Sequence, residues 1–271
     1  MIFADKFIYL ELAKTGSTYA RYILKNLKKN NPRVIGKKHN VYSSLNKEQQ
    51  IEFKSKIKIG NIRNPFDWYV SQFAFACEHR GGLYTKTQIR PDILSIYQPH
   101  QILNLPFNHL KNRKKWKEVF SDVNNIKNFE LFLDLLFDKD PLGAGLKYYY
   151  SGMSEIMGFL SYDYFRTYTY NFDKNARKLT SYNDVCAYFD KYYCIDIMLR
   201  NENLINELLN IGNLICNDQN EMKDAINARP KKSKTATKRN PFQYYYSDRT
   251  IEMIYKKEQF IIDKYEYAYQ I

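Results

Sequence analysis

The spacing of apolar residues changes near the start of the chain. Residues 7–12 form a short apolar and aromatic run, which predicts a buried strand. From residue 20 onward, apolar residues recur on one face of a helix and basic residues on the other; the apolar ones are Ala20, Ile23, Leu24 and Leu27. The polar sequence KTGST lies between the two patterns. The pattern therefore predicts a strand, a tight turn and a helix.

A second strand and helix follow in the same order. Between residues 56 and 62, isoleucines alternate with lysines, which predicts a strand that ends before Arg63. Asn64 is a suitable N-cap for the next helix and Pro65 a suitable first residue. The apolar stripe of that helix comprises Phe66, Tyr69, Val70, Phe73 and Cys77. Ser71 lies off the stripe, so we expect Arg63 and Ser71 near the same sheet edge as Lys14.

Weaker patterns complete a predicted single domain over residues 1–271. We expect an edge strand at 34–39, a buried strand at 195–199, and helices at 47–53, at 129–137, at 203–210 with Gly212 just beyond its end, and from Asp248. Residues from about 80 to 170 break the alternation and are interpreted as a variable insertion of helices and loops. Tyrosines between 147 and 170 could stack on sugars or bases, but a half-buried aromatic core is the expectation.

The predicted fold class is α/β, with a P-loop-NTPase-like central parallel sheet flanked by helices and the insertion in the middle of the chain. Hydrophobic residues make up 44% of the sequence, enough for a sizeable core. The net charge of +13 favours an anionic partner. The four cysteines form no CxxC pair, and neither a signal peptide nor a membrane span is apparent. We therefore expect a cytoplasmic protein with reduced thiols and no transmembrane segment.

The KTGST turn has the chemistry of an anion-binding site. Gly16 permits a sharp turn and a close approach of the backbone to a ligand. Ser17 and Thr18 can cap the following helix, whose first N–H groups and dipole favour negative charge. With the ammonium group of Lys14, the turn suits a phosphate or a sulfate. A P-loop would place the lysine after a second glycine, whereas Lys14 precedes Gly16, and a well-capped connection without a ligand is the alternative.

Together the two strand–helix units resemble the sulfotransferases that use 3′-phosphoadenosine 5′-phosphosulfate (PAPS). The resemblance rests on KTGST after a strand and on RNPFDWYVS at residues 63–71. It implies a nucleotide-binding protein in which the 5′-phosphosulfate contacts the first loop, at Lys14, Thr15, Gly16, Ser17 and Thr18. It also implies that Arg63 and Ser71 bind the 3′-phosphate.

A late basic run is the third feature that the resemblance concerns. Residues 229–239 read RPKKSKTATKR, and in this family a late basic loop folds over the 3′-phosphate. The resemblance therefore assigns Lys231 and Lys232 to nucleotide binding. The alternative for such a run is a solvated loop that binds no ligand.

The resemblance implies transfer of the sulfuryl group from PAPS to a hydroxyl or amine by in-line displacement. The product would be 3′-phosphoadenosine 5′-phosphate (PAP), and no metal is implied. Lys14 would stabilise the leaving phosphate. His39 is the first candidate for the base, because neutral histidine accepts protons near pH 7 and the K-H pair resembles a segment of many glycan sulfotransferases. Glu11 is the second candidate, with an ion pair to Lys14 or Arg63 as its alternative role.

Two other classes of function remain open. A P-loop-like nucleotide kinase would need the P-loop order of glycine and lysine, and an aspartate at a strand end for magnesium. A basic nucleic-acid-binding protein would explain the charge but not two phosphate-binding units, so no stable nucleic-acid partner is expected. The expected acceptor is a small molecule, a glycan or another hydroxyl-bearing compound. The sequence fixes neither its identity nor the oligomeric state.

Overall fold

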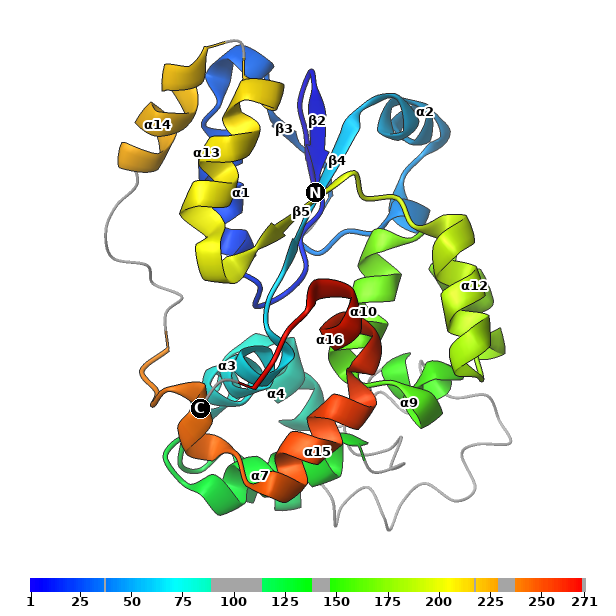
Figure 1. Ribbon diagram of the computed structural model, residues 1–271, viewed down its shortest axis with the longest axis vertical. Coiled ribbons are helices and arrows are strands. Elements are labelled where there is room, and N and C mark those ends of the chain that lie inside the picture. The colour runs from blue at the N-terminus through cyan, green and yellow to red at the C-terminus, as the bar shows by residue number, and fades with distance from the viewer. Residues whose placement is uncertain (37, 89–113, 138–146, 217, 229–236, 270–271) are drawn as a thin grey trace. The chain divides into compact units, whose positions relative to one another are not determined.

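The computed structural model describes residues 1–36, 38–88, 114–137, 147–216, 218–228 and 237–269. The fold is α/β, as expected, with one five-stranded sheet among the described residues and many helices (Figure 1). The chain divides into two compact units. The first comprises Met1–Asn64, Asp163–Ala176 and Asn183–Ala236, and the second Pro65–Tyr162, Arg177–Tyr182 and Thr237–Ile271. The single domain with an insertion at residues 80–170 stays a prediction.

The sheet belongs to the first unit and has the strand order β3-β1-β2-β4-β5. Its strands are β1 (Ile2–Phe3), β2 (Phe7–Tyr9), β3 (Arg33–Val34), β4 (Ile57–Ile62) and β5 (Ile197–Arg200). β2, β4 and β5 run parallel, whereas β1 is antiparallel to both β2 and β3. The sheet is therefore mixed, and the expectation of a parallel sheet holds for three strands. A two-residue strand such as β1 is too short to show an alternating pattern in the sequence.

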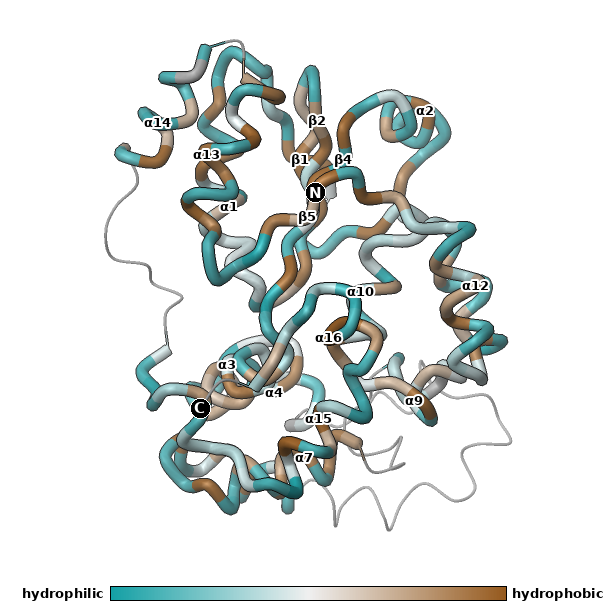
Figure 2. Tube along the Cα trace, viewed as in Figure 1, coloured by the Kyte–Doolittle hydropathy of each residue, from teal (hydrophilic) through white to brown (hydrophobic). Residues whose placement is uncertain are grey.

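Helices lie on both sides of this sheet in the first unit. α1 (Ser17–Lys25), α13 (Leu204–Ile215) and α14 (Gln219–Asn227) lie on one side, and α2 (Lys47–Ser55) on the other (Figure 1). Ile23 and Leu24 of α1 share one hydrophobic core with Ile59 and Leu199 of the strands. The strands are largely hydrophobic, whereas α2 and α14 are largely hydrophilic (Figure 2). This packing holds the start of α1 at the carboxyl end of β2.

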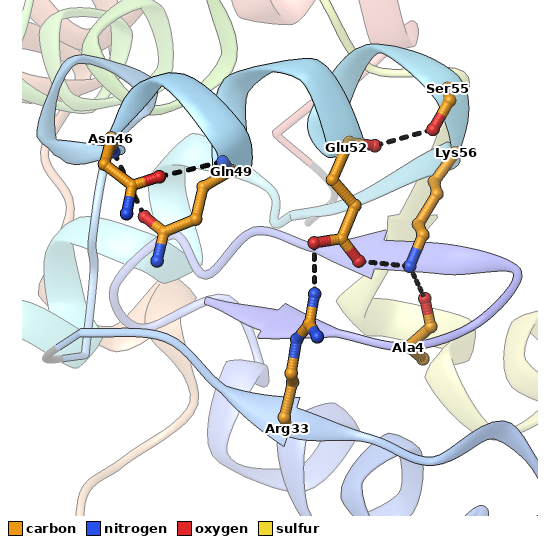
Figure 3. Close-up of polar contacts among 7 residues, drawn as sticks. All are labelled: Ala4, Arg33, Asn46, Gln49, Glu52, Ser55 and Lys56. Carbon is orange, nitrogen blue, oxygen red and sulfur yellow. Dashed lines mark hydrogen bonds and ion pairs between the residues drawn. The ribbon is translucent and has the colours of Figure 1, made fainter.

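Polar contacts anchor α2 near both of its ends (Figure 3). Asn46 is the N-cap and forms a capping box with the first turn of the helix. Glu52, in the last turn, pairs with Arg33 of β3 and with Lys56. Nζ of Lys56 also donates to the backbone carbonyl oxygen of Ala4 at 2.5 Å. These contacts tie α2 to the edge of the sheet formed by β1 and β3.

The second unit is mostly helical and has an aromatic core. Its helices are α3 (Pro65–Cys77), α4 (Gly81–Gln88), α7 (Ile126–Phe137), α9 (Met153–Ile156), α15 (Asp248–Lys257) and α16 (Gln259–Tyr265), with the first turn of α10 (Phe159–Tyr168). The ring of Phe73 lies 5.4 Å from that of Phe129 and 5.6 Å from that of Phe132. α3 begins at Pro65, as predicted, but it is buried on nearly all sides and not along one stripe.

The rest of α10 belongs to the first unit, with α11 (Phe172–Asn175) and nearly all of α12 (Tyr182–Tyr192). The rings of Tyr164 and Tyr168 lie 5.1 Å apart, and those of Phe189 and Tyr193 lie 4.4 Å apart. In the second unit, Tyr148 is likewise buried. The expectation of an aromatic core is therefore confirmed for these tyrosines.

Two helix ends differ from the expectation. α13 continues past Gly212 to Ile215. Gly212 faces α14 at close range, since a Cβ there would lie 3.2 Å from Cβ of Met222. The helix expected from Asp248 is divided into α15 and α16 at Glu258, which is fully buried. A glycine needed for close packing has the same sequence signal as a helix-ending glycine, which explains the first error.

Candidate anion-binding site

The loop between β2 and α1 makes a sharp turn at the carboxyl end of the sheet. β2 ends at Tyr9, and the N–H of Leu10 still donates to the carbonyl oxygen of Ile59 in β4 at 2.9 Å. The backbone then takes left-handed φ values at Lys14 (62°) and Gly16 (75°). For a lysine this conformation costs about 1–2 kcal/mol, and such strain concentrates at functional sites. The strain favours a binding loop over a simple connection.

Gly16 leaves no room for a side chain. A Cβ at this position would lie 2.3 Å from Oδ1 of Asn201 and 2.8 Å from Cδ2 of Leu204. Gly16 is also the N-cap of α1, so no side chain caps this helix. The expectation that Ser17 or Thr18 caps it is therefore wrong, because the helix begins at Ser17 and both residues lie in its first turn. An anion at this end would take the place of a capping side chain.

The three hydroxyl groups of the KTGST sequence have different surroundings. Oγ1 of Thr15 is buried and donates to the carbonyl oxygen of Leu12 at 2.9 Å, which closes the loop on itself. Ser17 is buried, with its carbonyl oxygen 3.5 Å from the hydroxyl of Tyr9. Oγ1 of Thr18 is part of a partly exposed side chain and lies 3.4 Å from Nζ of Lys38. Thr15 therefore shapes the loop, and Thr18 is the hydroxyl nearest to a second lysine.

Arg63 joins the end of β4 to this loop. Its Nη1 donates to the backbone carbonyl oxygen of Lys14 at 3.0 Å, which brings the two predicted motifs together within the first unit. Arg200 ends β5, and its Cα pairs in register with Ile62, the residue before Arg63. The carboxyl edge of the sheet therefore carries a lysine and two arginines. Together with the N-terminus of α1, these cations favour a ligand with several negative charges.

The segment before α2 places a histidine and a lysine against the same loop. Nδ1 of His39 lies 2.9 Å from the backbone carbonyl oxygen of Glu11. Because a carbonyl oxygen only accepts, this contact requires a proton on Nδ1, and in the neutral ring the lone pair is then on Nε2. His39 is exposed and has a left-handed φ of 58°. Lys38, whose Nζ lies next to Thr18, was not among the residues predicted for the site. The K-H pair that it forms with His39 in the sequence is the pattern that could have indicated it.

The carboxylate of Glu11 is buried at the start of the loop. Its Oε2 pairs with Nη1 of Arg21 on α1, and the side chain has no exposed surface. Glu11 is therefore an ion-pair partner of Arg21, whereas the sequence suggested Lys14 or Arg63 for that role. Burial and this ion pair favour a structural role, and a catalytic role for Glu11 stays a prediction.

Three residues assigned to the 3′-phosphate lie outside the first unit or outside the described residues. Ser71 belongs to α3 in the second unit and is buried, with 4% of its surface exposed. Lys231 and Lys232 lie outside the described residues, so their predicted roles stay predictions. The last residue of the basic run, Arg239, is described and pairs with Asp67 in the first turn of α3. One guanidinium group of the basic run is therefore bound to the RNPFD segment.

Three comparisons with known proteins complete the description of the site. No family model, curated protein or solved structure matched the chain.

Within the described residues, no group of three or more His, Cys, Asp or Glu side chains could hold a metal ion. In the same part of the chain, none of the helices is both long and apolar enough to cross a membrane.

Proposed function

We propose that this protein is a PAPS-dependent sulfotransferase with a P-loop-like fold, transferring the sulfuryl group to a hydroxyl or amine of an acceptor. One observation carries the proposal: Arg63 and His39 both contact backbone carbonyl oxygens of the same loop. The two distances are 3.0 Å to Lys14 and 2.9 Å to Glu11. A cation for the nucleotide and a base for the acceptor therefore flank a helix start that favours anions.

The proposed reaction is an in-line displacement at sulfur. The acceptor oxygen forms a bond to sulfur while the bond between sulfur and the bridging oxygen breaks, and PAP leaves with that oxygen. As in phosphoryl transfer, positioning and electrostatic stabilisation supply most of the catalysis. Lys14 stabilises the charge that grows on the bridging oxygen. His39 takes the acceptor's proton at Nε2.

Nucleotide binding uses the remaining groups of the loop. The backbone amides and hydroxyls of Gly16, Ser17 and Thr18 hold the 5′-phosphate at the start of α1. Arg63 binds the 3′-phosphate, where its fork of N–H donors matches phosphate oxygens. The roles that the resemblance implies for Ser71, Lys231 and Lys232 stay predictions.

The ends of the strands favour this proposal over a nucleotide kinase. A kinase needs a carboxylate at the edge of the sheet near the loop, to hold magnesium. β4 and β5 end next to Arg63 and at Arg200 instead. Asp196 precedes β5, at the opposite end of the strand, and its carboxylate pairs with Nζ of Lys58 at 2.9 Å. One carboxylate lies at this edge, because Oε1 of Glu202, two residues after β5, accepts the backbone N–H of Asn64 at 2.6 Å. Lys14, Arg63 and Arg200 outnumber it there, which favours an anionic substrate that is bound directly by cations.

A thermal-shift panel tests the proposal. PAP without magnesium should stabilise the protein, because a ligand that binds only the folded state raises its stability with ligand concentration. ATP with magnesium and single-stranded oligonucleotides, measured in parallel, should give smaller shifts. A larger shift with magnesium ATP would favour a kinase. A response to oligonucleotides that falls steeply with salt, with none to PAP, would favour a nucleic-acid-binding protein.

A further inference from the structure

Asn61 is a buried polar residue near the end of β4. None of its surface is exposed, and among the described residues neither Nδ2 nor Oδ1 has a hydrogen-bond partner. An asparagine side chain can donate two hydrogen bonds and accept others. Buried amides without partners are rare, because they lose their bonds to water and gain nothing in return. The position of Asn61 therefore needs an explanation.

The backbone of Asn61 is fully bonded. The hydroxyl of Tyr168 accepts from the N–H of Asn61 at 2.8 Å and donates to its carbonyl oxygen at 2.7 Å. Because β2 ends at Tyr9, this hydroxyl occupies the place that a neighbouring strand would otherwise fill. The backbone is thus held firmly, so a displaced main chain does not account for the unbonded side chain.

The alternation along β4 places this side chain on the face that α1 and α13 cover. Asn61 follows Ile59 by two residues, and its Cα pairs in register with Leu199. Ile59 and Leu199 both belong to the core shared with α1 and α13. On the same face, the hydroxyl of Tyr9 lies 3.5 Å from the carbonyl oxygen of Ser17, the first residue of α1. The unbonded amide therefore lies on the sheet face below the start of α1.

We propose that Asn61 is a positioning residue for the anion-binding loop, and that its amide gains hydrogen-bond partners when an anion with phosphate groups occupies the loop. The inference rests on the function proposed above. The N–H and C=O of a peptide group point in opposite directions. When an anion binds, the loop peptide groups that turn their N–H towards it turn their C=O towards the core. In that complex, Nδ2 of Asn61 donates a hydrogen bond to one of these carbonyl oxygens.

This coupling has a definite thermodynamic signature. The ligand-free protein carries the cost of an unbonded buried amide, and the complex recovers it. Removing the amide should therefore leave the ligand-free protein as stable as before, or more so, and weaken anion binding. A merely structural asparagine would show the reverse, with lower stability and unchanged affinity.

Asn30 provides a matched control in the same unit. It is 1% exposed, and within the described part of the chain both of its amide atoms also have no partner. Its carbonyl oxygen accepts the N–H of Asp5, in the turn before β2, at 2.9 Å. Asn30 therefore lies near the amino end of β2, whereas the loop leaves from the carboxyl end.

The experiment compares Asn61→Leu and Asn61→Ser with the same substitutions at Asn30. Inorganic pyrophosphate and PAP are titrated calorimetrically into each variant and into the wild-type protein. Asn61→Leu should bind both anions about tenfold more weakly, and Asn61→Ser, which keeps a donor, should lie between it and wild type. The Asn30 variants should stay within about twofold of wild type. Serine is smaller than asparagine, so it keeps the test available if leucine does not fit.

The outcomes separate this inference from the proposed function. Wild-type binding of both anions with no selective loss at Asn61 would overturn the inference alone. Wild-type binding of pyrophosphate without PAP would remove the proposed function, and the pyrophosphate comparison would still decide the role of Asn61. A wild-type protein that binds neither anion would overturn both.

Discussion

The buried carboxylate of Glu258 makes the stability of the second unit depend on pH. Glu258 lies between α15 and α16 and has no exposed surface. It accepts the backbone N–H of Leu160 at 3.1 Å, and the N–H and hydroxyl of Ser161 at 2.9 Å and 2.6 Å. The hydroxyl of Tyr69 is a fourth donor. All four donors are neutral groups.

Burial raises the pKa of Glu258 from 4.5 to about 7, although the hydrogen bonds from Ser161, Tyr69 and Leu160 lower it. A pKa that is higher in the folded state means that the folded protein binds the proton more tightly. The contribution of Glu258 to the free energy of unfolding is then highest below about pH 4.5 and falls as the pH rises through 7. At about 1.36 kcal/mol per pH unit, this change in pKa corresponds to about 3 kcal/mol.

Glu258→Gln removes the titration and nearly preserves the side-chain shape. Urea unfolding followed by tryptophan fluorescence reports on this unit, because both tryptophans of the chain, Trp68 and Trp116, are buried in it. Between pH 4.5 and 8, the free energy of unfolding of the wild-type protein should fall by about 3 kcal/mol relative to that of Glu258→Gln. Glu252→Gln, at an exposed position of α15, is the control and should follow wild type.

Parallel curves for wild type and Glu258→Gln would refute this reasoning, because they would mean that the pKa of Glu258 is the same in the folded and unfolded states. A wild-type protein that gains stability relative to Glu258→Gln as the pH rises would also refute it. That result would require charged groups that stabilise the ionised carboxylate in the folded state.

Three further predictions concern the first unit. His39→Ala should lower turnover about 10²–10⁴-fold and leave PAP affinity unchanged, whereas Lys14→Ala should lower both turnover and PAP affinity. Turnover is measured with labelled PAPS and a panel of acceptors. The same change in turnover and affinity in both variants would contradict the assigned roles. Gly16→Ala should cost about 1–3 kcal/mol in chemical unfolding and abolish PAP binding, unlike Gly82→Ala, where a Cβ would meet nothing within 4 Å. Tyr168→Phe, which removes the hydroxyl bonded to the β4 backbone, should cost about 1–3 kcal/mol; an unchanged unfolding midpoint would contradict it.

The elements around the loop could be predicted because their hydrophobic patterns are local. β2 begins at Phe7 and α3 at Pro65, as the sequence indicated, and β4 begins one residue later than expected. The contact between Arg63 and the loop also follows from sequence, since parallel strands that end together bring their following residues to one edge.

Other features depend on contacts between distant residues and leave little local signal. The approach of Lys38 to Thr18 joins side chains that are 20 positions apart in the sequence. The break at Glu258 could not be seen either, because a fully buried glutamate in an amphipathic pattern looks like a surface residue. The division of the chain into two units likewise reflects long-range packing.

Calorimetric titration of PAP and adenosine 5′-phosphate, without magnesium, into wild type and Arg63→Ala tests the central claim most directly. The account predicts that wild type binds PAP more tightly than the monophosphate. Arg63→Ala should weaken PAP by about 1.5–3 kcal/mol more than the monophosphate, because only PAP loses charged hydrogen bonds to a 3′-phosphate, whereas the contact of Arg63 with the Lys14 carbonyl is lost for both ligands. Equal wild-type affinities for the two nucleotides, or equal losses in Arg63→Ala, would contradict the account.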